Sequence, residues 1–215
     1  MTINLVSGTS GASGIGRRER RRTETRDRIF RAAMELFAKR GFSATTVEDI
    51  TEAADVGKGT FFNYFPSKEH VLGVLHEIQL QKISHALAAA KAGKLSIRDV
   101  LRELVLRIAE EPARSQLLAR GLLLTVLSND AVRELMADMM SRARTMLGQV
   151  LTMGQERGEV RPEVSPEEGA SNFQQLVLGT VLLWSIGPAA PLEKRLSGAF
   201  RLFWAGVARK PGETA

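Results

Sequence analysis

Residues 45–69 read TTVEDITEAADVGKGTFFNYFPSKE and contain two short helical patterns joined by a turn. The turn is predicted at Asp55-Val56-Gly57, and Pro66 ends the second pattern because its ring cannot continue the helical hydrogen-bond ladder. Two short helices joined by a glycine-containing turn are typical of a helix-turn-helix motif, whose second helix enters the major groove of DNA. We therefore place such a motif at about residues 45–64.

The first helix of the motif is predicted over about residues 46–54. Thr45 and Glu48 match a capping box, in which the hydroxyl accepts a hydrogen bond from a free amide and the carboxylate reaches back. The second helix is predicted over about residues 58–65, with Phe61 directed toward the core. The opposite, polar face of this second helix is then free to meet DNA.

That polar face carries side chains with the chemistry needed to read base edges, namely Lys58, Gly59, Thr60 and Asn63. Lys58 can donate to a phosphate or to a guanine edge, and Gly59 lets the backbone come close to the DNA. Thr60 can contact a phosphate, a base or a thymine methyl group. Tyr64 offers a hydroxyl to a phosphate, and Lys68 places a charge beside the free amides of the next helix.

Another helix is predicted to precede the motif, from Thr23 or Thr25 to Lys39. Its apolar residues recur at helical spacing and form one stripe, which comprises Ile29, Ala32, Ala33, Leu36 and Phe37. Gly41 then supplies a left-handed stop. This helix would complete a small three-helix unit around the motif.

Residues 1–22 are predicted to form a flexible basic arm. The formal net charge of the chain is +6, and a Gly/Ser-rich stretch leads into a cluster of arginines that runs from Arg17 to Arg22. The arm is either a solvated tail or a second contact, attracted to phosphate or to a narrow minor groove. The sequence leaves both interpretations open.

The remainder of the chain also reads as helical, since no segment sustains the apolar–polar alternation that is typical of strands. Helices are predicted over about residues 67–90, 96–110, 112–128, 130–158, 166–186 and 191–210. The predicted fold class is therefore all-α. We divide the chain into a small N-terminal domain at residues 23–82 and a larger helical domain at residues 83–215.

The predicted helix over residues 130–158 is rich in methionine. At helical spacing such residues are typical of an ordinary core, but methionine adapts its shape and also suits a cavity for varied apolar ligands. On that second interpretation the candidates for a ligand pocket are Leu117, Leu118, Leu122, Met136, Met140, Phe173 and Trp184. The last two helices are also rich in apolar residues, which can complete the core of the subunit.

Several other classes of protein are excluded by composition and motif. Without cysteine the chain has neither a disulfide nor a thiolate metal site, and the spacing of His70, His76 and His85 puts them on different helix faces. The sequence contains no nucleophile elbow and no phosphate loop, so we expect no catalytic residue, no cofactor and no metal. It also contains no apolar run of the ~20 residues that span a membrane, and no signal peptide, so we expect a cytoplasmic protein without a membrane partner.

A family resemblance covers about residues 23–80. The stretches TTVEDI (45–50) and VGKGTFFNYFPSKE (56–69) resemble the DNA-binding region of the TetR family of bacterial regulators. The upstream residues that resemble the family's first helix are Ile29, Ala32, Leu36, Phe37 and Gly41-Phe42. The resemblance implies a homodimer, in which an N-terminal three-helix DNA-binding domain precedes a larger domain that binds a ligand and dimerises through its last two helices.

By position, the resemblance also implies the roles of individual residues. Phosphate contacts would come from Thr45 or Thr46, Tyr64 and Lys68, and base reading from Lys58, Gly59, Thr60 and Asn63. Phe62 departs from the family pattern, which often has a tyrosine that hydrogen-bonds a phosphate at this position. We expect Phe62 to pack against a sugar instead.

The predicted function is therefore that of a DNA-binding transcriptional regulator and not of an enzyme. Family members are usually repressors that leave a double-stranded DNA operator when a small molecule binds, and the effector expected here is apolar. The alternative is a small-molecule binding or sequestering protein in which the helix-turn-helix is only a packing unit. The basic arm and the polar residues Lys58, Thr60 and Asn63 favour the regulator.

Overall fold

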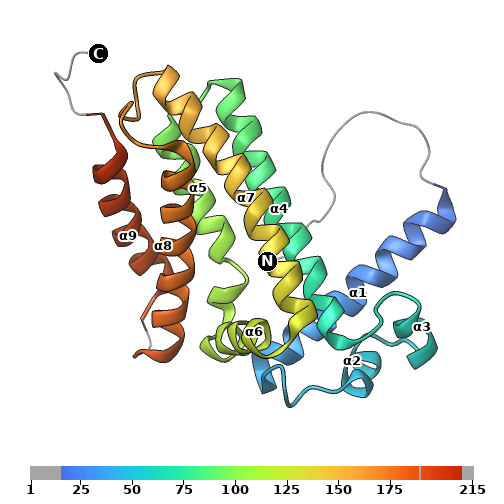
Figure 1. Cartoon of the computed structure of the whole chain (residues 1–215). Coiled ribbons are helices and arrows are strands. Elements are labelled where there is room, and N and C mark those ends of the chain that lie inside the picture. The colour runs from blue at the N-terminus through green and yellow to red at the C-terminus, as the bar shows by residue number, and fades with distance from the viewer. Residues whose placement is uncertain (1–15, 189, 210–215) are drawn as a thin grey trace.

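The computed structural model describes residues 16–188 and 190–209, and within these ranges the chain is folded into helices (Figure 1). The β pairing recorded among these residues is an isolated bridge between Val160 and Ala208. The predicted all-α fold class is therefore confirmed.

The N-terminal end of the molecule is formed by α1 (Arg17–Arg40), α2 (Val47–Ala53), α3 (Lys58–Phe62) and the first turns of α4 (Lys68–Ala92). Its core is built on the apolar stripe predicted for α1, since Ile29 and Phe37 are fully buried. Ile50 of α2 and Phe61 of α3 are fully buried in the same cluster. These contacts hold α2 and α3 together at one end of the molecule (Figure 1).

Helix α1 begins at Arg17, earlier than the predicted start at Thr23 or Thr25. The two threonines do not cap the helix, because their hydroxyls donate to carbonyl oxygens one turn back, at 3.1 and 2.9 Å. Arginine is a good helix former, and Arg20 pairs with Glu24 one turn later at 3.4 Å. The prediction of a flexible arm is therefore wrong for residues 17–22, while residues 1–15 lie outside the described residues.

The larger helical domain contains the rest of α4, α5 (Ile97–Ala109), the 3₁₀ helix η1 (Pro112–Arg114), α6 (Gln116–Ser128), α7 (Asp130–Glu156), α8 (Pro166–Ile186) and α9 (Leu192–Val207). Helix α7 packs between α4 and α8, and α8 packs on α9. The single helix predicted over residues 112–128 is in fact two elements. Ser115 interrupts it with extended backbone (φ −162°) and caps α6 by accepting a hydrogen bond from the amide of Leu118 at 2.9 Å.

Two hydrophobic cores divide the molecule, and α4 contributes to both. Leu72 and Leu75 lie in the N-terminal core, whereas Ile83 and Ala86 lie in the core of the larger domain. Helix α4 runs without interruption through residues 82–83, where we placed the boundary between the domains. A movement of this helix is therefore shared by both cores.

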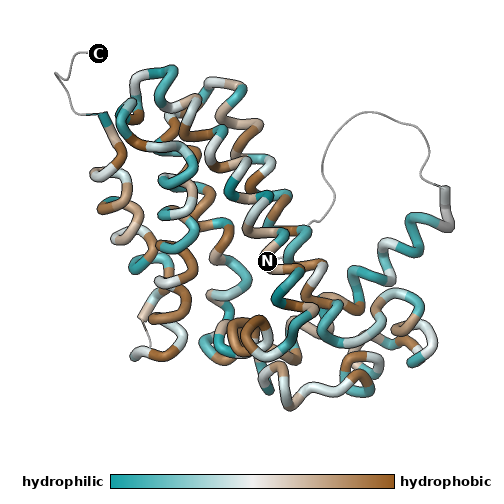
Figure 2. The backbone as a smooth tube through the Cα atoms, viewed as in Figure 1, coloured by the Kyte–Doolittle hydropathy of each residue, from teal (hydrophilic) through white to brown (hydrophobic). Residues whose placement is uncertain are grey.

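Helix α6 is the second link between the two cores, and most of its length is hydrophobic (Figure 2). Its Leu118 is buried in the N-terminal core, and Ser115 at its start donates to the carbonyl oxygen of Ala38 in α1 at 3.0 Å. Gly121 lies so close to the loop before α2 that a Cβ there would be 3.3 Å from the Cβ of Phe42. The larger domain thus contacts both α1 and this loop.

Candidate functional site

Helices α2 and α3 and the turn between them form a helix-turn-helix at one end of the molecule (Figure 1). The turn depends on Asp55, which adopts a left-handed conformation with φ 49°, and α3 then begins after Gly57. Helix α3 ends at Phe62 and not at Phe65 as predicted, because the amide of Tyr64 bonds to the carbonyl of Phe61 in a tighter turn, at 2.9 Å.

The outer side of α3 is available to a partner. We call Lys58, Gly59, Thr60 and Asn63 the α3 face: Thr60 is half-buried and the other three are exposed. A side chain built on Gly59 would meet no protein atom within 4 Å, so packing within this protein does not require a glycine there. Phe61 is fully buried, and its ring lies 5.4 Å from that of Phe62 and 5.7 Å from that of Phe65. The aromatic core fixes the orientation of α3 and leaves the α3 face outward.

Lys58 of the α3 face is paired with Glu48 of α2. The hydrogen bond from Lys58 is the largest reason why the pKa of Glu48 lies below its usual value. Both side chains are largely exposed, so the pair exchanges readily with solvent. A DNA phosphate or guanine edge would compete with Glu48 for the same ammonium group.

The capping role predicted for Thr45 belongs to Thr46. Thr45 is fully buried, and its hydroxyl donates to the carbonyl oxygen of Gly41 at 2.8 Å, so it cannot reach a phosphate. The capping box is formed by Thr46 with Asp49 and not by Thr45 with Glu48. The amide of Asp49 donates to the hydroxyl of Thr46 at 3.1 Å, and the amide of Thr46 donates to the carboxylate of Asp49 at 2.8 Å. Of the two threonines, only the exposed Thr46 remains a phosphate candidate.

Lys68 is half-buried, and its hydrogen bonds connect the loop before α2 to the start of α4. Its ammonium group donates to the carbonyl oxygens of Phe42 and Thr45, both at 2.9 Å, and lies 4.6 Å from the centre of the Phe42 ring. A lysine has three N–H donors, so one is left for a phosphate. The sequence predicted the charge at this position but not its structural use. Phe62, at 52% exposure, and the half-buried Tyr64 lie at the end of α3.

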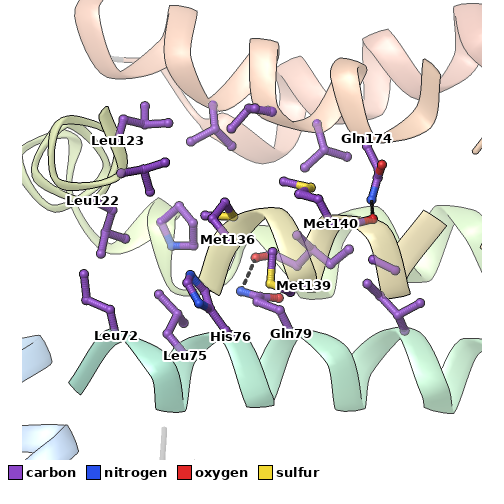
Figure 3. A pocket seen from close by; sticks show the side chains of 18 of the residues that line it. Leu72, Leu75, His76, Gln79, Leu122, Leu123, Met136, Met139, Met140 and Gln174 are labelled. Atoms are coloured by element: carbon purple, nitrogen blue, oxygen red, sulfur yellow. Dashed lines mark hydrogen bonds between the residues drawn. The ribbon is translucent and has the colours of Figure 1, made fainter. Parts of the chain in front are cut away.

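A cavity of about 150 Å³ lies between α4, α6, α7 and α8 (Figure 3). Four of the residues predicted for a ligand pocket line it, namely Leu122, Met136, Met140 and Phe173. Its lining is otherwise dominated by aliphatic side chains and contains no Asp, Glu, Lys or Arg among the described residues. A volume of this kind admits a compact apolar molecule.

Three other residues predicted for the pocket lie elsewhere. Leu117 packs against the glycine at the end of α1, 3.5 Å from the position of a Cβ on Gly41. Leu118 is buried in the N-terminal core. Trp184 belongs to the core of the larger domain, and its ring nitrogen donates to the carbonyl of Ala190 at 2.6 Å. Apolar character alone could not distinguish these positions from the cavity wall.

The cavity also contains polar side chains that our sequence reasoning missed, namely His76, Gln79 and Gln174. His76 and Gln79 share the face of α4 that carries Leu72, Leu75 and Ile83, so the available signal was a polar interruption of an apolar stripe. Burial lowers the pKa of His76 below its usual value of 6.5. The histidine is therefore neutral at physiological pH.

The outer surfaces of α8 and α9 carry exposed apolar side chains. Leu183 and Ile186 of α8 are 62% and 64% exposed, and Leu202 of α9 is 78% exposed. In contrast Trp184, Leu196 and Phe200 are buried within the subunit. The two helices thus contribute one face to the core and present another to the outside.

Two further properties bear on the class of protein. Within residues 16–188 and 190–209, none of the helices combines the length and hydropathy needed to cross a membrane. The same part of the chain holds no group of three or more His, Asp or Glu side chains arranged to bind a metal ion.

Comparison with known sequences assigns the N-terminal region. A family model described as "Bacterial regulatory proteins, tetR family" matches residues 29–75. The HTH-type transcriptional regulator TcmR of Streptomyces glaucescens is 48% identical over 62 residues, which cover 29% of this chain and 27% of TcmR. The HTH-type transcriptional regulator UidR of Escherichia coli K12 is 24% identical over 143 residues, or 66% of this chain and 71% of UidR. The match to TcmR therefore spans only about a quarter of that relative.

Solved structures extend the similarity to the larger domain. FadR of Thermus thermophilus, a TetR family transcriptional repressor in complex with lauroyl-CoA, is 32% identical with a TM-score of 0.62, over 88% of this chain and 100% of that one. SmeT, the repressor of the Stenotrophomonas maltophilia multidrug efflux pump SmeDEF, has a TM-score of 0.69 over 88% of this chain and 93% of its own. At 20% identity, SmeT shows a shared fold.

An N-terminal helix-turn-helix with an outward polar face, followed by a larger helical domain, defines a DNA-binding transcriptional regulator. The chain belongs to the TetR family of bacterial regulatory proteins, since it matches the whole length of FadR at 32% identity and the family model over its helix-turn-helix. The relatives are named as regulators and not as enzymes, and they do not favour a protein that only sequesters small molecules.

Proposed function

We propose that this protein is a repressor that binds a specific DNA operator as a homodimer in the cytoplasm and leaves it when an apolar effector binds. The observation that carries the proposal is the arrangement of α3. Phe61 is fully buried and anchors the helix, while Lys58, Gly59 and Asn63 are exposed on the opposite side. An element of this kind can enter the major groove without disturbing the core.

Dimerisation is proposed through the exposed apolar surface of α8 and α9. Leu183, Ile186 and Leu202 are each more than half exposed to solvent in the single subunit. Large apolar side chains gathered on one surface mark an interaction site more often than scattered ones do. Two subunits paired there would present two helix-turn-helix motifs, which suits an operator with two half-sites.

The effector site is proposed to be the cavity between α4, α6, α7 and α8. An apolar lining without charged side chains favours an apolar ligand over a charged one. FadR of Thermus thermophilus, which is 32% identical, binds lauroyl-CoA, and the acyl chain of that molecule is also apolar. The coenzyme part of such a molecule would have to remain outside this cavity, since its phosphates would find no counter-charge within.

Release from DNA is proposed to follow from the two helices that belong to both the cavity and the N-terminal core. Leu72 and Leu75 of α4 line the cavity and are buried in that core. On α6, Leu122 lines the cavity while Leu118, one turn earlier, is buried beside α1. A ligand that moves either helix therefore alters the packing under α1 and changes the distance between the two motifs of the dimer.

The proposal is tested by a mobility-shift assay with the full chain and the DNA that flanks its own gene. We expect a shifted band at nanomolar to micromolar protein that survives an excess of unrelated DNA and weakens steeply as salt rises. An apolar compound that raises the melting temperature of the protein should also release the DNA. Binding that does not distinguish flanking from unrelated DNA would contradict a sequence-specific regulator.

A further inference from the structure

Two polar atoms in the wall of the cavity have no hydrogen-bond partner within the protein. They are the ring nitrogen Nδ1 of His76 and the side-chain oxygen Oε1 of Gln79. Both residues are more than nine-tenths buried and line the cavity. Buried polar groups are almost always satisfied, so two unpartnered atoms on residues that line a cavity indicate a partner from outside the chain.

The orientation of the Gln79 amide is fixed by its neighbour. Its Nε2 donates to the carbonyl oxygen of Ile108 at 3.1 Å, and a carbonyl can only accept. The end without a partner is therefore the oxygen, which requires a donor. A ligand that only accepts hydrogen bonds cannot satisfy Gln79.

His76 places the second condition on the ligand. As a neutral imidazole it offers a donor at one nitrogen and an acceptor at the other, and Nδ1 takes either part according to the tautomer. It lies one turn before Gln79 on the same face of α4, and both side chains point toward α7 (Figure 3). A group that donates to Gln79 and also accepts has the hydrogen-bonding chemistry that both atoms require.

The third polar residue of the wall provides a contrast. Gln174 has both ends occupied, because its Nε2 donates to the carbonyl of Met140 at 2.8 Å and its Oε1 accepts from Nε of Arg144 at 3.3 Å. It needs nothing from a ligand. The unmet hydrogen-bonding capacity is therefore confined to the α4 side of the cavity.

From these observations we infer that the effector is an apolar molecule with a neutral hydroxyl group, a phenol or an alcohol, which binds between His76 and Gln79. A hydroxyl donates its one hydrogen to Oε1 of Gln79 and accepts a hydrogen bond from the imidazole in the tautomer that carries the proton on Nδ1. A carboxylate is excluded because it cannot donate to Gln79 and finds no charged side chain in the wall. Met136 and Met139 lie opposite the two residues in Figure 3, and their flexible side chains can move aside for the ligand.

This inference rests on the proposed function only in taking the cavity as the effector site, and it is tested without DNA. The probes share one skeleton: 4-ethylphenol, 4-ethylanisole, ethylbenzene and 4-ethylbenzoate. Binding to the full chain is measured by calorimetry or ligand-observed NMR. We expect 4-ethylphenol to bind about tenfold more tightly than 4-ethylanisole, which keeps the oxygen but cannot donate, and 4-ethylbenzoate to bind most weakly. This comparison needs no altered protein.

Variants of the lining residues then test which side chains cause the preference for 4-ethylphenol. The affinity ratio of 4-ethylphenol to ethylbenzene should fall about tenfold in Gln79→Met and also in His76→Phe, because each removes one of the orphan atoms. Gln174→Met is the matched control, a change of the same side chain in the same wall, and should leave the ratio unchanged. The ratio is compared within one protein, so a general loss of stability does not alter it.

Two results would overturn the inference. One is a 4-ethylphenol affinity no higher than that of 4-ethylanisole in the unaltered protein, which would mean that water satisfies the two atoms. The other is a ratio that falls equally in Gln174→Met and Gln79→Met. Either result leaves the DNA-binding proposal standing, since that proposal is judged by the mobility shift alone.

Discussion

The ammonium group of Lys68, in the first turn of α4, donates a hydrogen bond to the carbonyl oxygen of Thr45 at 2.9 Å. Thr45 immediately precedes the cap of α2, so this bond sets where the helix-turn-helix begins relative to α4. A second bond, to the carbonyl of Phe42, fixes the other end of the same loop. Lys68 is thus a structural link as well as a candidate phosphate contact.

Replacing Lys68 by methionine tests that link. We expect the free energy of unfolding to fall by about 1–2 kcal/mol, because two charge-assisted hydrogen bonds at a half-buried position are lost. The measurement is chemical denaturation, with the exposed Lys39→Met as control. Unchanged stability, together with a salt dependence of DNA binding reduced by about one ion, would mean that Lys68 serves phosphate alone.

A substitution at Gly59 should change stability and DNA affinity in opposite directions. A Cβ at this helical position meets no protein atom, so Gly59→Ala should stabilise the fold by about 0.5–1 kcal/mol through its helix propensity. Operator affinity should nevertheless fall on the order of tenfold, because the added methyl group stands between α3 and the DNA. Gly73→Ala, also without a contact within 4 Å, is the control and should leave DNA binding intact. Unchanged operator affinity in Gly59→Ala would contradict a close approach of this backbone to DNA.

The exposed surface of α8 and α9 predicts a dimer. Sedimentation velocity at micromolar concentration should show twice the mass of the chain, and Ile186→Lys should shift the equilibrium toward the monomer because a charge is placed in the apolar contact. Leu135→Lys changes an exposed leucine on α7 and should not affect the association. A monomer in the unaltered protein would rule out this interface.

The buried histidine predicts a pH dependence of stability. The pKa of His76 is lowered by burial, so below its usual value of 6.5 the unfolded chain takes up a proton more readily than the folded one. Stability should therefore be lost as the pH falls from 6.5 toward the lower pKa of the folded state, and be unaffected by this group above that range. Denaturation curves of the unaltered protein and His76→Phe between pH 7.5 and 5 provide the measurement. Their difference should change with pH, and parallel pH profiles would contradict the assignment.

Local signals in the sequence predicted the fold well. The apolar stripe of α1 and the breaks between later helices depend on neighbouring residues, and such signals are readable without tertiary contacts. One error occurred where two local solutions compete. Either Thr45 or Thr46 could cap α2, and burial of Thr45 decided the choice.

The candidate sites were predictable to different degrees. The residues of the α3 face lie in one short stretch of chain, so their positions within the helix-turn-helix motif were enough to predict that they share a face. The cavity wall draws on α4, α6, α7 and α8, and only packing shows that Leu122 faces it while Leu118 does not. His76 and Gln79 were missed because the sequence does not show whether a polar side chain on an apolar stripe has hydrogen-bond partners within the fold.

The most direct test of the central claim is the operator preference of the α3 face. Binding of the unaltered protein, Lys58→Ala, Asn63→Ala and Lys68→Met to the operator and to unrelated DNA is compared by fluorescence anisotropy at one salt concentration. We predict that Lys58→Ala and Asn63→Ala each reduce the difference in binding free energy between the operator and unrelated DNA by about 1–3 kcal/mol. Lys68→Met should weaken both kinds of binding alike and leave that difference unchanged. An unchanged ratio in both Lys58→Ala and Asn63→Ala would contradict the claim that α3 reads the DNA sequence.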